Sequence, residues 1–142
     1  MDVQEHFFNV STNIGTRWDV DVLLWVDHEP DPAVPVAVVP VRRIGADPVL
    51  VMMYVDPAYR GGFWPTMVAG VHAHWPRLFH HGQLSPAALV LASREGWDRH
   101  PSITATPDIL WTEEKAQEVS DWGGTRLEFF HAEWMKTQSE GN

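Results

Sequence analysis

The sequence predicts an α+β protein in which an antiparallel meander is followed by strands that are linked by helices. The segment from Arg17 to Asp27 alternates apolar and polar residues with a period of two, which is typical of a strand. Residues 49–55 are apolar throughout, whereas the segment after Pro65 has apolar residues at helical spacings of three and four. A chain of 142 residues is most simply one domain, so we expect a single domain over residues 1–142.

The first third of the chain predicts a short helix and two strands. Residues 2–8 follow a capping signal and are predicted to be helical, with a turn at residues 13–15. The strand that ends at Asp27 then leads through a loop to a second β-rich run over residues 34–44. Pro35 and Pro40 cannot donate a backbone hydrogen bond, so this run is predicted to be an edge strand or to be bulged.

A third strand is predicted over residues 49–55, buried on both faces and antiparallel to residues 34–44. A loop at residues 80–83 and a short buried strand from Ala87 to Ala92 are expected further along. The third strand is predicted to splay from residues 87–92, which would leave a V-shaped opening near Tyr54.

Two helices are predicted in the second half of the chain. The first begins at Pro65, since proline suits the first turn of a helix, and Pro76 is expected either to kink it or to end it. Its inward-facing residues are Met67, Val68, Val71, Trp75 and Leu78. The second covers residues 112–122, with Gly123-Gly124 as its stop, and an alternating strand over residues 125–135 precedes seven frayed residues.

Composition narrows the classes of partner. The chain has 10 Lys and Arg against 19 Asp and Glu, and its only close basic pair is Arg42-Arg43. Nucleic-acid binding requires clustered positive charge, so we expect no direct nucleic-acid partner. There is no cysteine for a disulfide or thiolate zinc site. The sequence has neither a signal-peptide pattern nor a run of 18 apolar residues, so we expect a cytoplasmic protein with no membrane partner.

Histidines and carboxylates suggest no defined metal site. His72 and His74 are two residues apart, which places them on different faces of a helix and makes them poor co-ligands. We therefore expect no metal. Asp19 and Asp21 share one face of a strand, where they are either solvated or available to bind an amine.

Seven of the eight tryptophans divide into two groups by their surroundings in the sequence. The tryptophans expected in the core are Trp18, Trp25, Trp75 and Trp134. Those expected in or beside loops, where they would serve a ligand or partner surface, are Trp64, Trp97 and Trp111.

The most informative stretch runs from an apolar strand into Asp56-Pro57 and then into Tyr59-Arg60-Gly61-Gly62, before a segment compatible with a helix. A strand that passes through a glycine turn into a helix leaves unpaired amides pointing one way, and the helix dipole adds positive potential. This is an arrangement for binding an anion. The run Val55-Asp56-Pro57-Ala58-Tyr59-Arg60-Gly61-Gly62 also resembles the acyl-CoA-binding segment of the GNAT superfamily of N-acyltransferases.

The resemblance extends over residues 17–92 and implies a GNAT-like central sheet with flanking helices. It implies a small N-acyltransferase that moves an acetyl group from acetyl-CoA to an unknown amine or protein acceptor by direct attack. The residues implied to bind acetyl-CoA are Met53, Tyr54 and Val55, which align the thioester, and Arg60, Gly61, Gly62 and Phe63, which hold the diphosphate. The resemblance assigns no catalytic acid or base.

A second hypothesis remains open because the sequence departs from the family pattern. Phe63 and Trp64 are bulky where the diphosphate requires close approach, and the only tyrosines are Tyr54 and Tyr59. The alternative is a non-catalytic, acidic binding protein on the same scaffold, which inhibits or adapts a larger protein. An enzyme requires Phe63 and Trp64 to turn away from the cofactor site, whereas a binding protein requires at least one of them to fill it or to be exposed.

Overall fold

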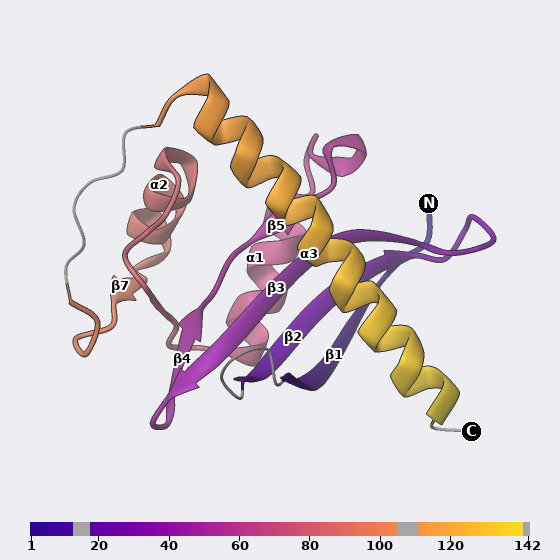
Figure 1. Cartoon of the computed structure of the whole chain (residues 1–142), viewed down its shortest axis with the longest axis horizontal. Helices are drawn as coiled ribbons and strands as arrows, with labels where there is room; N and C mark the ends of the chain where they lie inside the picture. The colour runs from indigo at the N-terminus through magenta and orange to yellow at the C-terminus, as the bar shows by residue number, and fades with distance from the viewer. Residues whose placement is uncertain (13–17, 105–110, 141–142) are drawn as a thin grey trace.

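The computed structural model describes residues 1–12, 18–104 and 111–140, and Figure 1 shows their arrangement. The strands are β1 (Val3–Thr12), β2 (Trp18–Asp27), β3 (Val34–Ile44), β4 (Asp47–Leu50), β5 (Tyr54–Val55), β6 (Phe79–His80) and β7 (Asp98–Arg99). The helices are α1 (Trp64–His74), α2 (Pro86–Glu95) and α3 (Glu113–Glu140), and a 3-10 turn covers Pro57–Tyr59. The predicted α+β class is confirmed.

The strands form one mixed, open sheet in the order β1-β2-β3-β4-β6-β7, with β5 paired to β3. The pairs that β1 to β5 form with one another are antiparallel, whereas β4 and β6, and β6 and β7, are parallel. Parallel neighbours require a crossover, and α1 and α2 supply the two crossovers. An antiparallel meander followed by helix-linked strands is therefore what the structure contains.

Helices cover both faces of the sheet, with α3 crossing one face and α1 lying behind the other (Figure 1). The first core, here called the α1 core, includes Leu23, Trp25, Val39, Met67, Val71 and Leu78. The second, the α3 core, includes Val20, Val22, Leu24, Val26, Val38, Leu127 and Phe130. Alternate residues of β2 enter opposite cores because successive side chains of a strand point to opposite faces. The predicted strand at β2 is confirmed, and both of its faces are buried.

The predicted helix over residues 2–8 is wrong, since residues 3–8 belong to β1. All ten residues of β1 pair with β2, from Val3 opposite Asp27 to Thr12 opposite Trp18. The Asp2 amide donates to the Asp27 carboxylate, so Asp2 begins the sheet and caps no helix. Long-range pairing outweighs the weak local preference of this segment. The turn predicted at residues 13–15 lies outside the described residues.

Strand β3 is central, so the prediction of an edge strand is wrong, although the predicted bulge is present. It lies between β2 on one side and β4 and β5 on the other. Its register with β2 shifts between Trp25, which pairs with Ala37, and Val26, which pairs with Pro35. The bulge therefore falls beside Pro35, where the strand lacks a donor.

The strand predicted over residues 87–92 is a helix, α2. Ser85 caps it by accepting a hydrogen bond from the Ala88 amide at 3.1 Å, and Pro86 occupies its first turn. Gly96 ends it in the left-handed conformation, with φ of 74°. The parallel partner of β4 is the short strand β6, which takes up part of the loop predicted at residues 80–83.

Helix α3 covers residues for which the sequence predicted a helix up to residue 122, a glycine stop, a strand over residues 125–135 and a frayed end. The predicted stop and strand are wrong. The helix runs from Glu113 to Glu140 without a break, and Thr112 caps it by accepting a hydrogen bond from the Lys115 amide at 3.1 Å. Gly123 is buried within it, because the ring of Tyr54 packs against that position. The glycine permits a close approach of the helix to the sheet and does not end the helix. No helix in the described ranges combines the length and apolarity needed to cross a membrane.

Candidate functional site

A one-residue bulge separates β4 from β5 at the position predicted to align a thioester. Leu50 pairs with Val41 and Tyr54 pairs with Val38, so the three residues 51–53 lie opposite the two residues 39–40 of β3. The segment that joins β4 to β5 therefore contains one extra residue. Strand β4 pairs with β6 before the bulge, whereas β5 pairs only with β3. The segment that contains β4 and β5 therefore diverges from β6 near Tyr54. A divergence near Tyr54 was predicted, but the strand from which it occurs is β6 and not residues 87–92.

The bulge leaves backbone amides free. The Asp56 amide donates to the Val36 carbonyl at 2.7 Å, and amides alternate in direction along a strand. The amides of Met53 and Val55 consequently point away from β3, toward the side where β5 has no neighbouring strand. Among the described residues, the Met52 and Met53 amides have no hydrogen-bond acceptor. These are free donors beside the position where the two strands diverge.

The glycine turn supplies a second set of free amides. Asp56 starts the 3-10 turn by accepting from the Ala58 amide at 2.9 Å, and Gly62 has a φ of 102°. Helix α1 follows with no side-chain cap. Within the described residues, the amides of Gly61, Phe63 and Trp64 have no acceptor. A Cβ placed on Gly61 or Gly62 meets no atom within 4 Å, so an anion has open access to this turn.

Arg60 is folded back between the bulge and the turn. Its Nε donates to the Val55 carbonyl at 2.9 Å, and its guanidinium lies 5.3 Å from the centre of the Tyr54 ring. The positive charge is thereby held near both groups of free amides. Met53, Tyr54, Val55, Arg60, Gly61, Gly62 and Phe63, the residues predicted to bind acetyl-CoA, lie along this one continuous segment.

The position of Phe63 agrees with the enzyme hypothesis, whereas the position of Trp64 agrees with the binding-protein hypothesis. Phe63 turns inward and packs edge-on against Trp25 at 5.8 Å, within the α1 core. Its side chain is therefore directed away from the turn, as an enzyme requires. Trp64 is 36 % exposed at the start of α1, as expected for a contact with a partner.

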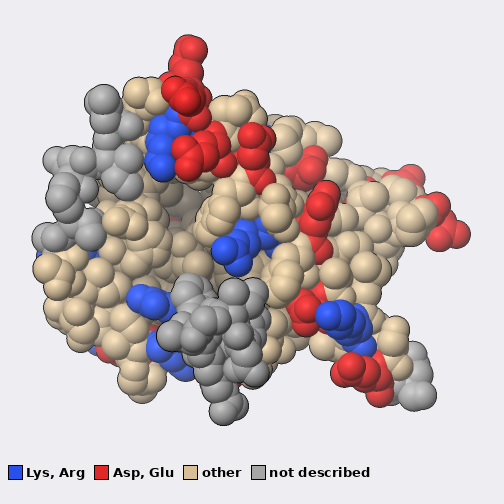
Figure 2. Space-filling model, viewed as in Figure 1, with Lys and Arg blue, Asp and Glu red and all other residues tan. Residues whose placement is uncertain are grey.

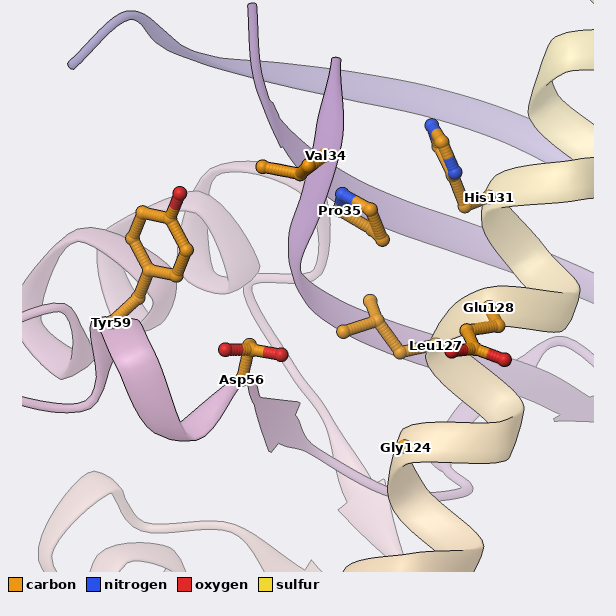
Figure 3. A pocket seen from close by; sticks show the side chains of 8 residues that line it. All are labelled: Val34, Pro35, Asp56, Tyr59, Gly124, Leu127, Glu128 and His131. Carbon is orange, nitrogen blue, oxygen red and sulfur yellow. The ribbon is translucent and has the colours of Figure 1, made fainter. Parts of the chain in front are cut away.

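A pocket of about 420 Å³ adjoins this segment on the α3 side of the sheet (Figure 3). Asp56 and Tyr59 line it from the 3-10 turn, whereas Gly124, Leu127, Glu128 and His131 line it from α3, with Val34 and Pro35 of β3 between them. Sequence reasoning missed its α3 wall because residues 125–135 were assigned to a strand. The spacing of 124, 127, 128 and 131 is the helical signal that identifies this wall.

A buried carboxylate beside the pocket joins three segments of the chain. Asp27 is 4 % exposed and accepts hydrogen bonds from the Asp2 amide, the Glu29 amide and the Tyr59 hydroxyl, at 3.0, 3.1 and 3.0 Å. Burial by itself raises the pKa of Asp27, but these three hydrogen bonds outweigh it and hold the pKa below its ordinary value of 3.8. The network fixes Tyr59, and hence the 3-10 turn, against the end of β2.

We expect Asp27→Asn to be less stable than the wild type at pH 7, by a margin that shrinks in acid. A carboxylate with a lowered pKa stabilises the folded state above its unfolded pKa, and this stabilisation is lost as the pH falls through the folded pKa. Urea unfolding between pH 7 and pH 3 measures the margin, with Asp98→Asn on the exposed strand β7 as the control. A margin that is constant with pH would contradict the role assigned to Asp27.

His131, which lines the pocket, belongs to a cluster of three histidines and one tryptophan. His6 and His28 are in contact through their Nε2 atoms at 3.1 Å, and Trp134 packs against His6, His28 and His131. Burial, and then the neighbouring His28, lowers the pKa of both His6 and His131, which keeps these rings neutral at pH 7. The described residues contain no group of three His, Asp or Glu side chains that could hold a metal ion.

The other sequence candidates lie apart from this site. Asp19 bonds to Ser11 at 2.6 Å and Asp21 to Asn9 at 3.1 Å, which places both carboxylates in surface pairs on the β1–β2 ladder. His72 forms a hydrogen bond with Glu95 at 2.8 Å, between α1 and α2.

The expectation for Trp97 is wrong, because only 5 % of it is exposed and it packs in the α1 core. Trp25 and Trp75 are in the core as predicted, and Trp134 is half-buried against the α3 core. Trp111 is also half-buried, whereas the side chain of Trp18 lies outside the described part of the chain.

Acidic side chains gather at the N-terminal end of α3, and the surface beside that end is hollowed (Figure 2). Glu113 and Glu114 occupy the first turn of the helix, where negative charge complements the helix dipole.

Comparison of the chain with protein-family models, with curated proteins and with solved structures gives no match.

Proposed function

We propose that this protein is a small N-acyltransferase of GNAT type that takes acetyl-CoA as its acyl donor. The observation that supports the proposal is the juxtaposition of two groups of free amides on one segment. The bulge leaves the Met52 and Met53 amides free, and the turn that follows leaves those of Gly61, Phe63 and Trp64 free. Arg60 lies between them.

Each group of amides suits one part of the donor. The Met53 amide, directed away from β3, would donate to the thioester carbonyl and stabilise negative charge on its oxygen. The amides of Gly61, Phe63 and Trp64, at the start of an uncapped helix, would bind the diphosphate. In the transfer, the neutral amine forms a bond to the carbonyl carbon, the carbon–sulfur bond breaks, the thiolate leaves and the amine loses its proton to a base.

Acetyl-CoA binding tests the proposal directly. We expect a dissociation constant in the micromolar range, which corresponds to about 8 kcal/mol. Isothermal titration calorimetry measures it. No heat and no thermal shift at millimolar acetyl-CoA would remove the enzyme hypothesis.

The glycines of the turn provide the variants. Gly61→Val should abolish acetyl-CoA binding and leave the melting temperature unchanged, because Gly61 has open space around it and no positive φ. Gly62→Val should also abolish binding, with some loss of stability, because its φ of 102° disfavours a β-branched residue. Gly45→Val is the matched control, since Gly45 has a φ of 62° and open space but lies in the β3–β4 turn. Normal binding by both turn variants would show that the donor does not use this turn.

The second hypothesis is that the protein binds a larger partner and catalyses nothing. The exposed side chain of Trp64 provides a test of it. If this hypothesis holds, Trp64→Ala would lower the affinity for a stoichiometric partner by about 2 kcal/mol or more, as expected for an aromatic anchor. Its acetyl-CoA binding would be unchanged. A partner recovered by pull-down and lost with Trp64→Ala would favour this hypothesis over the enzyme.

A further inference from the structure

The pocket between the 3-10 turn and α3 has the size and composition of a small-molecule site. Its volume of about 420 Å³ falls in the range of about 300–1,000 Å³ that is usual for such sites. The base is apolar, with Pro35 and Leu127, and Tyr59 adds an aromatic ring (Figure 3). No Lys or Arg is among the residues that line it.

Two carboxylates stand on opposite walls of this pocket. Asp56 belongs to the turn, and one of its oxygens accepts the Ala58 amide, which leaves the other without a partner in the described residues. Glu128 belongs to α3 and forms no hydrogen bond or ion pair with any described residue. Two negative charges that face a shared cavity without a cation repel one another, and a cation placed between them relieves the repulsion.

The remaining polar groups favour an organic cation over a metal ion. Tyr59 is committed to Asp27 through its hydroxyl, so it offers its ring and not its oxygen to the pocket. His131 has no hydrogen-bond partner in the described residues and stacks on Trp134. The carboxylates do not combine with it into a group that could hold a metal ion, within the described part of the chain.

We propose that this pocket binds a small organic cation, namely an ammonium group on an apolar or aromatic body, with Glu128 and Asp56 as its charge partners. The apolar body would cover Leu127 and Pro35, and the ammonium group would lie between the two carboxylates. The net charge of −9 attracts such a ligand at longer range.

The pocket adjoins the bulged strand. Asp56 directly follows Val55, and Gly124 directly follows Gly123, which contacts the Tyr54 ring. A bound amine would therefore lie next to the segment that carries the free amides. Its use as the acceptor in acyl transfer rests on the proposed function, whereas its binding does not.

Two probes of the same shape and different charge test the inference. Phenethylammonium should bind to the protein at low salt, with NMR shifts at Asp56, Glu128 and His131, and neutral phenethyl alcohol should bind at least tenfold more weakly. Equal binding of the two probes, or shifts confined to other residues, would overturn the proposal.

Matched variants separate the local charge from the net charge. Glu128→Gln should weaken phenethylammonium about fivefold, whereas Glu133→Gln, which removes the same charge from the same helix outside the pocket, should have little effect. Equal weakening by both variants would overturn the proposal.

Acetyl-CoA titration of the same proteins keeps the two proposals distinct. Glu128→Gln should bind acetyl-CoA as the wild type does. A wild type that binds acetyl-CoA but not phenethylammonium would overturn the cation pocket and leave the acyltransferase standing. The reverse result would support the pocket and overturn the acyltransferase.

Discussion

Gly123→Ala is expected to destabilise the protein by about 2–3 kcal/mol, although alanine is the better helix former. A Cβ on Gly123 would lie 2.3 Å from Cδ2 and 2.7 Å from Cε2 of Tyr54, distances that no packed structure sustains. The guanidinium of Arg60 lies over the Tyr54 ring, 5.3 Å from its centre, and restricts its movement, so α3 or β5 has to move. Urea unfolding and the thermal midpoint measure the loss, which should lower the midpoint by about 5–10 °C.

The neighbouring glycine is the matched control. A Cβ on Gly124 would lie 3.4 Å from the Tyr54 hydroxyl, an ordinary contact, so Gly124→Ala should stabilise α3 by about 0.5–1 kcal/mol. In a Tyr54→Ala background the cost of Gly123→Ala should disappear, because the clashing ring is gone. Equal effects of the two alanines in the wild-type background would contradict the close contact between Tyr54 and α3.

Trp25→Ala is expected to cost about 4 kcal/mol, the largest effect of any single substitution considered for this protein. Trp25 is 2 % exposed in the α1 core, and it contacts Phe63 of the turn and the position of Gly70 in α1. Its removal leaves a large cavity between the sheet and α1. Because Phe63 packs on it, the glycine turn should also lose its position.

The control for this prediction is another tryptophan of the same region. Trp64 is 36 % exposed, so Trp64→Ala should change stability by about 0.5 kcal/mol or less. Trp25→Phe should give an intermediate loss and keep the protein folded if Trp25→Ala does not fold. Chemical denaturation gives the three values, and a Trp25→Ala protein as stable as Trp64→Ala would contradict the core assignment.

Local patterns in the sequence were sufficient to predict an element wherever its tertiary contacts favour the same secondary structure as its own residues. The alternation of residues 17–27 predicted β2, and in the structure each of its two faces enters one of the two cores. Pro65 and the spacing of the apolar residues after it predicted α1. The order of strand, Asp-Pro, glycine turn and helix at the candidate site was also correct, because capping and turn formation depend on adjacent residues.

Some segments carry signals of the correct element beside a pattern that indicates a different one. Ser85, Pro86 and Gly96 are start and stop signals of a helix, and α2 uses all three, although the apolar run at residues 87–92 predicted a strand. A short apolar run does not distinguish a strand from a buried helix. Here the residues that flank the run, Ser85, Pro86 and Gly96, identify it as a helix.

The sequence by itself determined the α+β class, the strand β2, the helix α1 and the glycine turn before it, because each depends on residue types and spacings within a short segment. Tertiary structure decided the rest. Residues 3–12 became β1 by pairing along all of β2, and Gly123 lies within α3 because Tyr54 occupies the space a side chain would need. The pocket joins Asp56 to Glu128 only once α3 lies across the sheet, and contacts between residues so distant in the chain depend on packing and not on local preference.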